Sequence, residues 1–128
     1  MIMKNIDFND LYNIANNLAN EKQLNDKTYV GRVAVALLTS NNNVYTGICL
    51  KTTCALSFCA ETAAIANMLT NNESHIIKLV AVYEGGQIIS PCGHCRELIY
   101  QINHNNIKCE ILLENNRIVT LEDLLPEL

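Results

Sequence analysis

The chain has 128 residues, of which 49% are hydrophobic and 17% charged, a balance typical of a domain that buries a core. This length leaves no room for a second domain, so we expect one domain over residues 1–128. The formal charge of −4 gives a mildly acidic surface, which excludes bulk binding of polymeric nucleic acid by counterion release.

The N-terminus shows no export signal. Residues 1–7 carry one positive charge, and an Asn-rich amphipathic segment follows where a signal peptide would have about 7 to 15 apolar residues. The longest apolar run, residues 33–38, is far shorter than the roughly 20 residues that span a bilayer. We therefore expect a cytoplasmic protein that does not enter a membrane. In a reducing cytosol, six cysteines favour metal ligands, a redox pair or buried thiols over a disulfide framework.

The first half of the chain predicts a helix, a β-hairpin and a second helix. Over residues 8–22, apolar side chains recur at three- and four-residue spacing and share one helix face. Residues 33–38 and 44–50 are rich in branched side chains and flank a polar turn at 40–43, which predicts the hairpin. The Ala-rich stretch at residues 60–69 predicts the second helix.

The second half predicts three more strands and two more helices. Residues 76–83 are almost uninterrupted Ile, Leu, Val and Ala, as expected for a strand covered on both faces. The next elements are a helix at residues 95–102 and strands at residues 109–113 and 117–120. Thr120 and Asp123 resemble a capping box that opens a last short helix. Helices interleaved among strands predict an α/β fold, a three-layer α-β-α sandwich around a mixed five-stranded sheet.

Two cysteine motifs stand where predicted helices begin. Cys92 and Cys95 form a Cys-x-x-Cys pair that can bind one ion from a single turn, and Gly93 allows the backbone to fold tightly around it. Cys59 would add a third ligand and leave a fourth position open, as in catalytic zinc sites. The carboxylate of Glu61 could then reach a water at that position without being a ligand.

The helix starts also suggest how the charge of such a site is offset. Three thiolates around Zn²⁺ leave a net negative charge, which is costly when buried. Each helix N-terminus contributes roughly half a positive charge and free N–H donors. Arg96 can add a full positive charge and donate to a thiolate, so we expect thiolates at neutral pH.

The two motifs together resemble a known signature. Cys-Ala-Glu at residues 59–61, followed by Ser-Pro-Cys-Gly-x-Cys-Arg at 90–96, is similar to the small three-cysteine members of the cytidine deaminase superfamily. That group includes free-nucleoside cytidine deaminases and blasticidin S deaminase. Further likeness at residues 33–38, 44–47 and 122–126 extends the resemblance over roughly residues 29–126.

The resemblance implies a hydrolytic deaminase that converts a cytosine ring to uracil and releases ammonia. It implies one Zn²⁺ per chain, held by Cys59, Cys92 and Cys95. Glu61 would carry protons from water to the ring nitrogen and to the departing amino group. The backbone N–H of Ala60 would hold the base carbonyl, and the Ser90 carbonyl would receive the amino group. The resemblance also implies a homotetramer whose neighbouring chains line each site.

The sequence departs from this family at the expected sugar site. Cytidine deaminases bind the ribose hydroxyls through Asn-x-Glu, and here Cys49 and Lys51 take those two places. Thr62 replaces the usual Arg after Cys-Ala-Glu, and the aromatic residue expected near the C-terminus is absent. These departures argue against simple cytidine as the best substrate. We expect the other three cysteines, Cys49, Cys54 and Cys109, to be packing thiols.

Two other functions remain open at this point. The lost Asn-x-Glu pair would suit a zinc-binding deaminase fold that no longer catalyses and acts as a scaffold. A thiol redox protein would use Cys92 and Cys95, although that motif explains neither Cys59 nor Glu61. His94 lies between two ligands, and we expect its ring to point away from the ion.

Overall fold

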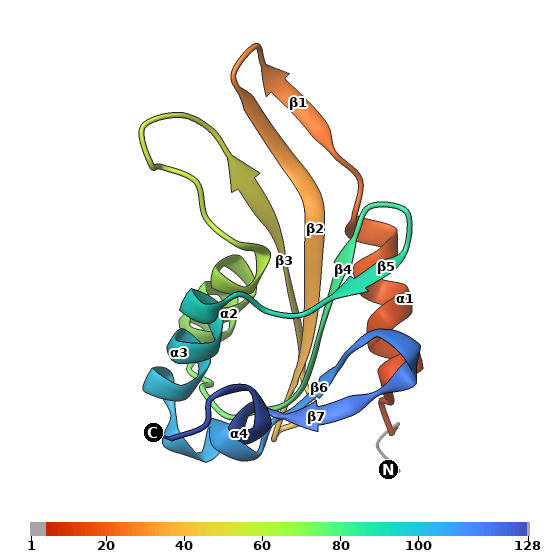
Figure 1. The fold of residues 1–128 in the computed structure, drawn as a ribbon, viewed down its shortest axis with the longest axis vertical. Coiled ribbons are helices and arrows are strands. Elements are labelled where there is room, and N and C mark those ends of the chain that lie inside the picture. The colour runs from red at the N-terminus through yellow and green to blue at the C-terminus, as the bar shows by residue number, and fades with distance from the viewer. Residues whose placement is uncertain (1–4, 128) are drawn as a thin grey trace.

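One mixed sheet organises residues 5–127, the part of the chain that the computed structural model describes (Figure 1). Most of the segment used to judge an export signal lies outside these described residues, as do both ends of the expected 1–128 domain. Within the described part, no helix has the length and apolar character needed to cross a membrane.

The helices are α1 (Phe8–Leu18), α2 (Ala60–Thr70), α3 (Gly93–Ile102) and α4 (Leu121–Leu124), with 3-10 turns η1 (His104–Lys108) and η2 (Glu114–Asn116). The strands are β1 (Lys22–Asn25), β2 (Thr28–Thr39), β3 (Val44–Lys51), β4 (Ile76–Tyr83), β5 (Gln87–Ile89), β6 (Glu110–Leu112) and β7 (Ile118–Thr120). The predicted order of helices and hairpin is confirmed. The helix expected over residues 8–22 ends earlier, at Leu18, because the chain turns there and enters β1.

The sheet contains seven strands in the described residues, so the expected number of five is wrong. The central order is β1-β2-β4-β6-β7, with β3 paired to β2 and β5 paired to β4. Among the described strands only β4 and β6 pair in parallel, which confirms a mixed sheet. The two missed strands carry weak signals: β1 is exposed along its whole length, and β5 has only three residues after the Gly85-Gly86 turn.

Helices cover both faces of the sheet, which confirms the three-layer α-β-α arrangement (Figure 1). Successive side chains of β2 point to opposite faces, because strand side chains alternate. Ala34, Ala36 and Leu38 are buried in the core beneath α1. Val35 and Leu37 are buried in the second core, beneath α2 and α3. Both faces of the central strands are therefore apolar and closed.

The contact between β3 and α2 is unusually close. Gly47 lies where the strand passes the helix, and a Cβ atom there would stand 2.6 Å from the Ala60 carbonyl oxygen. The missing side chain lets the first turn of α2 rest directly on the strand. In Figure 1 the amino ends of α2 and α3 lie side by side at this level of the sheet.

Candidate metal centre

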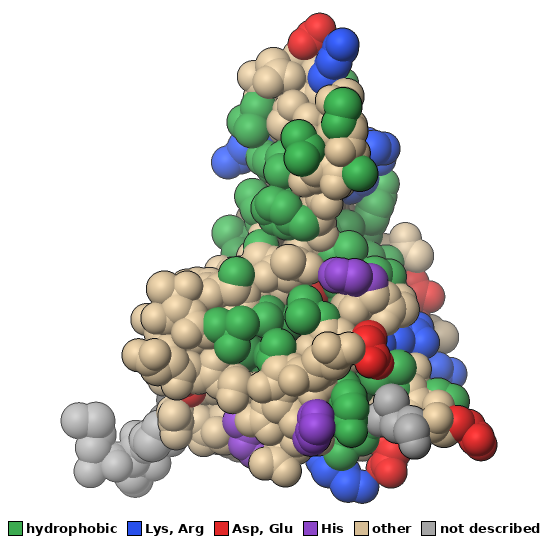
Figure 2. Space-filling model, turned by 90° about the vertical axis from the view of Figure 1, so that its left-hand side faces the viewer, with side chains coloured by type: hydrophobic (Ala, Val, Ile, Leu, Met, Phe, Trp, Pro, Cys, Tyr) green, Lys and Arg blue, Asp and Glu red, His purple; other side chains and the backbone are tan. Residues whose placement is uncertain are grey.

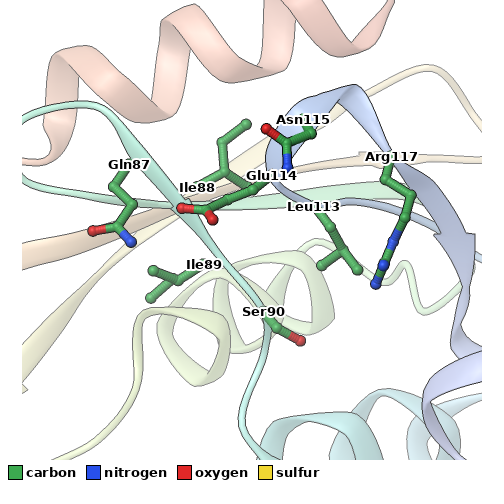
Figure 3. Close-up of a pocket in the computed structure, with 8 residues that line it drawn as sticks. All are labelled: Gln87, Ile88, Ile89, Ser90, Leu113, Glu114, Asn115 and Arg117. Atoms are coloured by element: carbon green, nitrogen blue, oxygen red, sulfur yellow. The ribbon is translucent and has the colours of Figure 1, made fainter.

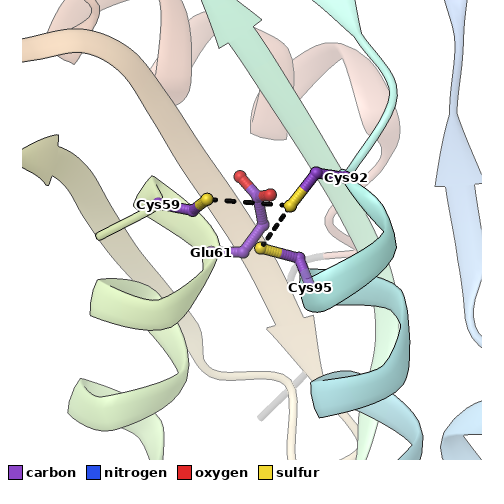
Figure 4. A group of neighbouring side chains, drawn as sticks. All are labelled: Cys59, Glu61, Cys92 and Cys95. Atoms are coloured by element: carbon purple, nitrogen blue, oxygen red, sulfur yellow. Dashed lines mark hydrogen bonds between the residues drawn. The ribbon is translucent and has the colours of Figure 1, made fainter. Parts of the chain in front are cut away.

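Four potential ligand groups converge between the amino ends of α2 and α3 (Figure 4). Cys59 is the N-cap residue of α2, and Glu61 lies in the first turn of that helix. Cys92 is the N-cap residue of α3, and Cys95 lies in its first turn. Their sulfur and carboxylate atoms all lie within 4.8 Å of one another. The structure therefore brings the three predicted ligands and the predicted proton carrier together.

The spacing of the sulfurs fits a zinc ion. The Sγ atoms of Cys59 and Cys92 are 3.7 Å apart, and those of Cys92 and Cys95 are 3.5 Å apart. Tetrahedral coordination with Zn–S bonds of about 2.3 Å places sulfurs about 3.8 Å from each other. A disulfide would need about 2.05 Å, and all six cysteines are free. The donor set, three sulfurs beside a carboxylate, also suits Zn²⁺.

The thiols do not ionise through the helix ends alone. Burial raises the pKa of Cys59, and burial together with the Glu61 carboxylate raises the pKa of Cys95. Burial also opposes ionisation of Cys92, but hydrogen bonds from the Cys95 backbone and thiol bring its pKa below the usual range. In the metal-free protein burial thus outweighs the helix ends at Cys59 and Cys95, and the expectation of three thiolates around a bound zinc stays a prediction. Thiol ligands lose their protons as a metal binds.

Glu61 is set up to hold a proton. Its side chain is buried, with 4% exposure, and burial raises its pKa although a hydrogen bond with Cys95 acts in the opposite sense. A carboxyl group with a raised pKa exchanges protons more readily near neutral pH than an exposed one. The position and environment of Glu61 therefore suit a general acid and base beside the metal ligands.

Arg96 makes different contacts from those expected. Its guanidinium donates from Nε to the Pro91 carbonyl at 2.8 Å and from an Nη to Ser90 Oγ at 2.9 Å. A third hydrogen bond, of 3.3 Å, reaches the Leu124 carbonyl. These bonds fasten the loop before α3 to the C-terminal segment rather than to a thiolate. The role of Arg96 in charge compensation stays a prediction.

A cavity of about 330 Å³ opens beside the four groups. Ala60 and Ser90, the predicted substrate contacts, line it together with Glu61. Sequence reasoning missed its apolar wall, which includes Leu50 and Phe58. These two residues are joined by two backbone hydrogen bonds of 3.0 Å, a tertiary contact with no sequence signature. The volume lies within the usual range for small-molecule sites.

A larger cavity, of about 430 Å³, shares Ile89 and Ser90 with the first one (Figure 3). Residues 87–90, 113–115 and Arg117 line it, and none of the four convergent groups does. Volume alone therefore does not identify the reactive site in this molecule.

The remaining cysteines and Gly93 differ in part from expectation. Cys109 is buried, and burial raises its pKa to about 12, as expected for a packing thiol. Cys54 is exposed, at φ 58°, so its assignment to packing is wrong. Cys49 is half-buried, accepts a hydrogen bond from the Val33 N–H at 3.3 Å and lines the 330 Å³ cavity. Gly93 has open space around its Cα, so the turn between the ligands does not require glycine.

Comparison with known proteins gives one consistent family. The family model described as "Cytidine and deoxycytidylate deaminase zinc-binding region" matches residues 7–111. A cytidine deaminase from Mycobacterium tuberculosis is 27% identical over 96 residues, which are 74% of this chain and 70% of that protein. A blasticidin-S deaminase from Bacillus cereus is 33% identical over 82 residues, 56% of each protein.

Solved structures agree with the sequence comparison. The crystal structure of the Mycobacterium tuberculosis cytidine deaminase has a TM-score of 0.79 at 26% identity, over 96% of this chain and 97% of that one. The cytidine deaminase from Mycobacterium leprae also gives 0.79, over 96% and 100% of the two chains. Its identity of 21% makes that likeness one of fold alone.

Proposed function

We propose that this chain, which belongs to the cytidine and deoxycytidylate deaminase family, deaminates the cytosine ring of a free nucleoside. The substrate would be cytidine, deoxycytidine or an analogue such as blasticidin S, and the products a uracil and ammonia. As a family member the chain is a hydrolase of C–N bonds, and zinc is its cofactor. The observation that carries the proposal is the convergence of three cysteines and a buried Glu61 beside a cavity of small-molecule size.

Each convergent group has a distinct role in this proposal. One Zn²⁺ would be held by Cys59, Cys92 and Cys95. When bound, zinc supplies the Lewis acidity that makes water nucleophilic near neutral pH. Ala60 is the first residue of α2 and lines the cavity, and its backbone N–H would donate to the base carbonyl. The Ser90 carbonyl would accept a hydrogen bond from the amino group.

Glu61 would carry both protons of the reaction. Its carboxylate takes the first proton from the attacking water and donates it to the ring nitrogen beside the amino-bearing carbon. It then takes the remaining hydroxyl proton and donates it to the amino group, which leaves as ammonia. Because burial raises its pKa, Glu61 can hold a proton between these transfers.

A substrate screen tests the proposed reaction. The purified zinc form would be incubated with cytidine, deoxycytidine, cytosine and blasticidin S, and the ultraviolet spectrum and ammonia followed. We expect release of ammonia from at least one nucleoside. If none of the four compounds is deaminated, this substrate class is wrong.

A second candidate function is a non-catalytic scaffold, because Cys49 and Lys51 stand where cytidine deaminases have the Asn-x-Glu pair. A scaffold would bind zinc and release no ammonia from any compound of the screen. A Cys92–Cys95 redox protein is less well supported, because Cys59 and Glu61 complete a metal-ligand set around that pair. Metal analysis separates the redox protein from the zinc-binding scaffold, since about one tightly bound zinc per chain leaves no free thiol pair.

We also propose that the 128 residues form one domain that assembles as a homotetramer in the cytoplasm, without binding polymeric nucleic acid. Exposed apolar side chains support an assembly: Leu24, Leu56 and Phe58 are 62%, 67% and 42% exposed. Figure 2 shows hydrophobic side chains on the end of the molecule that projects above its body. Size-exclusion chromatography with light scattering would show a mass of four chains, and a monomer would contradict the assembly.

A further inference from the structure

The cavity beside the candidate metal centre contains a cationic side chain. Lys51 is the last residue of β3, and it lines the same 330 Å³ cavity as Cys59 and Glu61. Because β3 runs past the start of α2, the fold places a lysine and the Glu61 carboxylate on one hollow although nine residues of chain lie between them. A molecule that reaches Glu61 with one end can therefore reach Lys51 with the other.

Lys51 also lines a second hollow that adjoins the first. This cavity, of about 120 Å³, shares Val33, Cys49 and Lys51 with the larger one. Glu21 and Arg32 form its other charged lining. The two hollows therefore meet at Val33, Cys49 and Lys51, so Lys51 stands at the border between them.

The Lys51 ammonium has no direct ion-pair partner within the described part of the chain. Arg32 has a partner, because its guanidinium lies 2.9 Å from a carboxylate oxygen of Glu21. Glu84 stands close to the same pair, since its carboxylate accepts the Glu21 backbone N–H at 2.9 Å. No hydrogen bond or ion pair joins the Lys51 ammonium to another residue of 5–127. Of the charged side chains that line this second hollow, Lys51 is therefore the one with no ion-pair or hydrogen-bond partner among residues 5–127.

We propose that Lys51 selects a cytosine nucleoside whose sugar bears an anionic group, a phosphate or a carboxylate. This inference rests on the proposed deaminase function and names its substrate class. An ammonium group offers three donors and no acceptor, so it cannot accept a hydrogen bond from a neutral sugar hydroxyl. The neighbouring Cys49 sulfur already accepts the Val33 N–H. An anion supplies both the hydrogen-bond acceptors and the negative counter-charge that the Lys51 ammonium lacks.

Four substrates test this inference: cytidine, cytidine 3′-monophosphate, cytidine 5′-monophosphate and blasticidin S, whose sugar carries a carboxylate. We expect a higher kcat/KM for at least one anionic compound than for cytidine. In Lys51→Gln the ratio of anionic to neutral kcat/KM should fall about tenfold, or about 1.4 kcal/mol, and in Lys51→Glu it should fall further. Comparing kcat/KM for the two monophosphates with that for blasticidin S shows whether the site prefers a phosphate or a carboxylate.

Lys27→Gln is the matched control. It removes the same charge from an exposed lysine at the turn between β1 and β2, which lines neither cavity. Its anionic-to-neutral ratio should equal that of the wild type. An equal fall in Lys27→Gln and Lys51→Gln would mean that only net charge matters and would overturn the inference.

Binding of the products gives a second readout that needs no turnover. By calorimetry, a uridine monophosphate should bind more tightly than uridine, and Lys51→Gln should remove the difference. Deamination of cytidine with no anionic preference, in either readout, overturns the inference and leaves the proposed function intact. Absence of deamination with every compound overturns the proposed function, while tighter, Lys51-dependent binding of the nucleotide would still support the anion site.

Discussion

At the residue scale, the metal site depends on which cysteines face one another. Cys95 and Cys109 are both buried free thiols, 0% and 1% exposed, but only Cys95 points at two other sulfurs. Cys95→Ser should therefore lose most of the zinc, because Zn²⁺ prefers a thiolate and a serine hydroxyl does not ionise at neutral pH. Cys109→Ser should retain about one zinc per chain. Metal analysis of the two variants checks this prediction, and equal zinc contents would contradict it.

A second residue-scale prediction concerns Glu73. Its carboxylate accepts hydrogen bonds from the Tyr45 hydroxyl at 2.6 Å, from Asn43 at 2.9 Å and from Asn41 at 3.0 Å. These bonds favour the charged form, with the Tyr45 bond the largest cause, and lower the pKa of Glu73 to about 2. The ordinary value is 4.5, so the stabilisation is complete above that pH and is lost as the pH falls toward 2.

Glu73→Gln should accordingly lower the melting temperature at pH 7. The difference from the wild type should shrink as the pH falls below about 4.5 and vanish near 2. Thermal unfolding followed by circular dichroism across this range measures it. The exposed Glu114 provides the control, since Glu114→Gln removes a carboxylate that accepts no such cluster of bonds. A constant difference at all pH values would show that ionisation of Glu73 is not the cause.

At the element scale, the contact of β3 with α2 holds the start of α2 in place. The Cβ of Gly47→Ala would meet the Ala60 backbone, so α2 must shift, and with it Cys59 and Glu61. We expect a loss of about 1–3 kcal/mol in the free energy of unfolding, and weaker zinc binding. Gly93→Ala is the matched control, because nothing lies within 4 Å of the added atom.

Denaturant unfolding and zinc titration measure both glycine variants. Gly93→Ala should be neutral or slightly stabilising, since alanine favours helix and Gly93 begins α3. If Gly47→Ala unfolds at the same denaturant concentration as the wild type, the close packing of β3 on α2 does not limit stability.

The elements differ in how far the sequence predicts them. The buried strand β4 and the hairpin of β2 and β3 follow from apolar runs and a polar turn, because burial requires that pattern. The capping box of Thr120 and Asp123 is confirmed because a local hydrogen bond needs only nearby residues. In contrast, β1 is exposed and polar, and it forms only because β2 offers a neighbouring edge.

The same distinction applies to the candidate site. The convergence of the three candidate ligands with Glu61 is predictable because each motif is short and lies at a helix start. The contacts of Arg96 with Ser90 and Leu124 are not predictable, since they depend on where the C-terminal segment passes α3. The raised pKa of Cys95 is likewise a consequence of burial, which no spacing of cysteines reveals.

At the scale of the whole molecule, the sheet serves to bring two distant chain segments together. Its two faces are closed by separate cores, and the amino ends of α2 and α3 meet over one of them. The four convergent groups thus lie at the starts of two helices, whereas part of the cavity wall comes from the segment around Leu50 and Phe58. Cys49 and Lys51, which take the places expected for the sugar-binding pair, line the same cavity as Cys59, Glu61 and Cys92.

The central claim is that the three cysteines and Glu61 form a working deaminase centre. The most direct test compares ammonia release by the zinc-loaded wild type and Glu61→Gln on the best nucleoside, with zinc measured in the same samples. We predict equal zinc contents and a rate lower by at least about 10²-fold in Glu61→Gln, because only the proton carrier is lost. Wild-type turnover by a zinc-loaded Glu61→Gln protein would contradict the account.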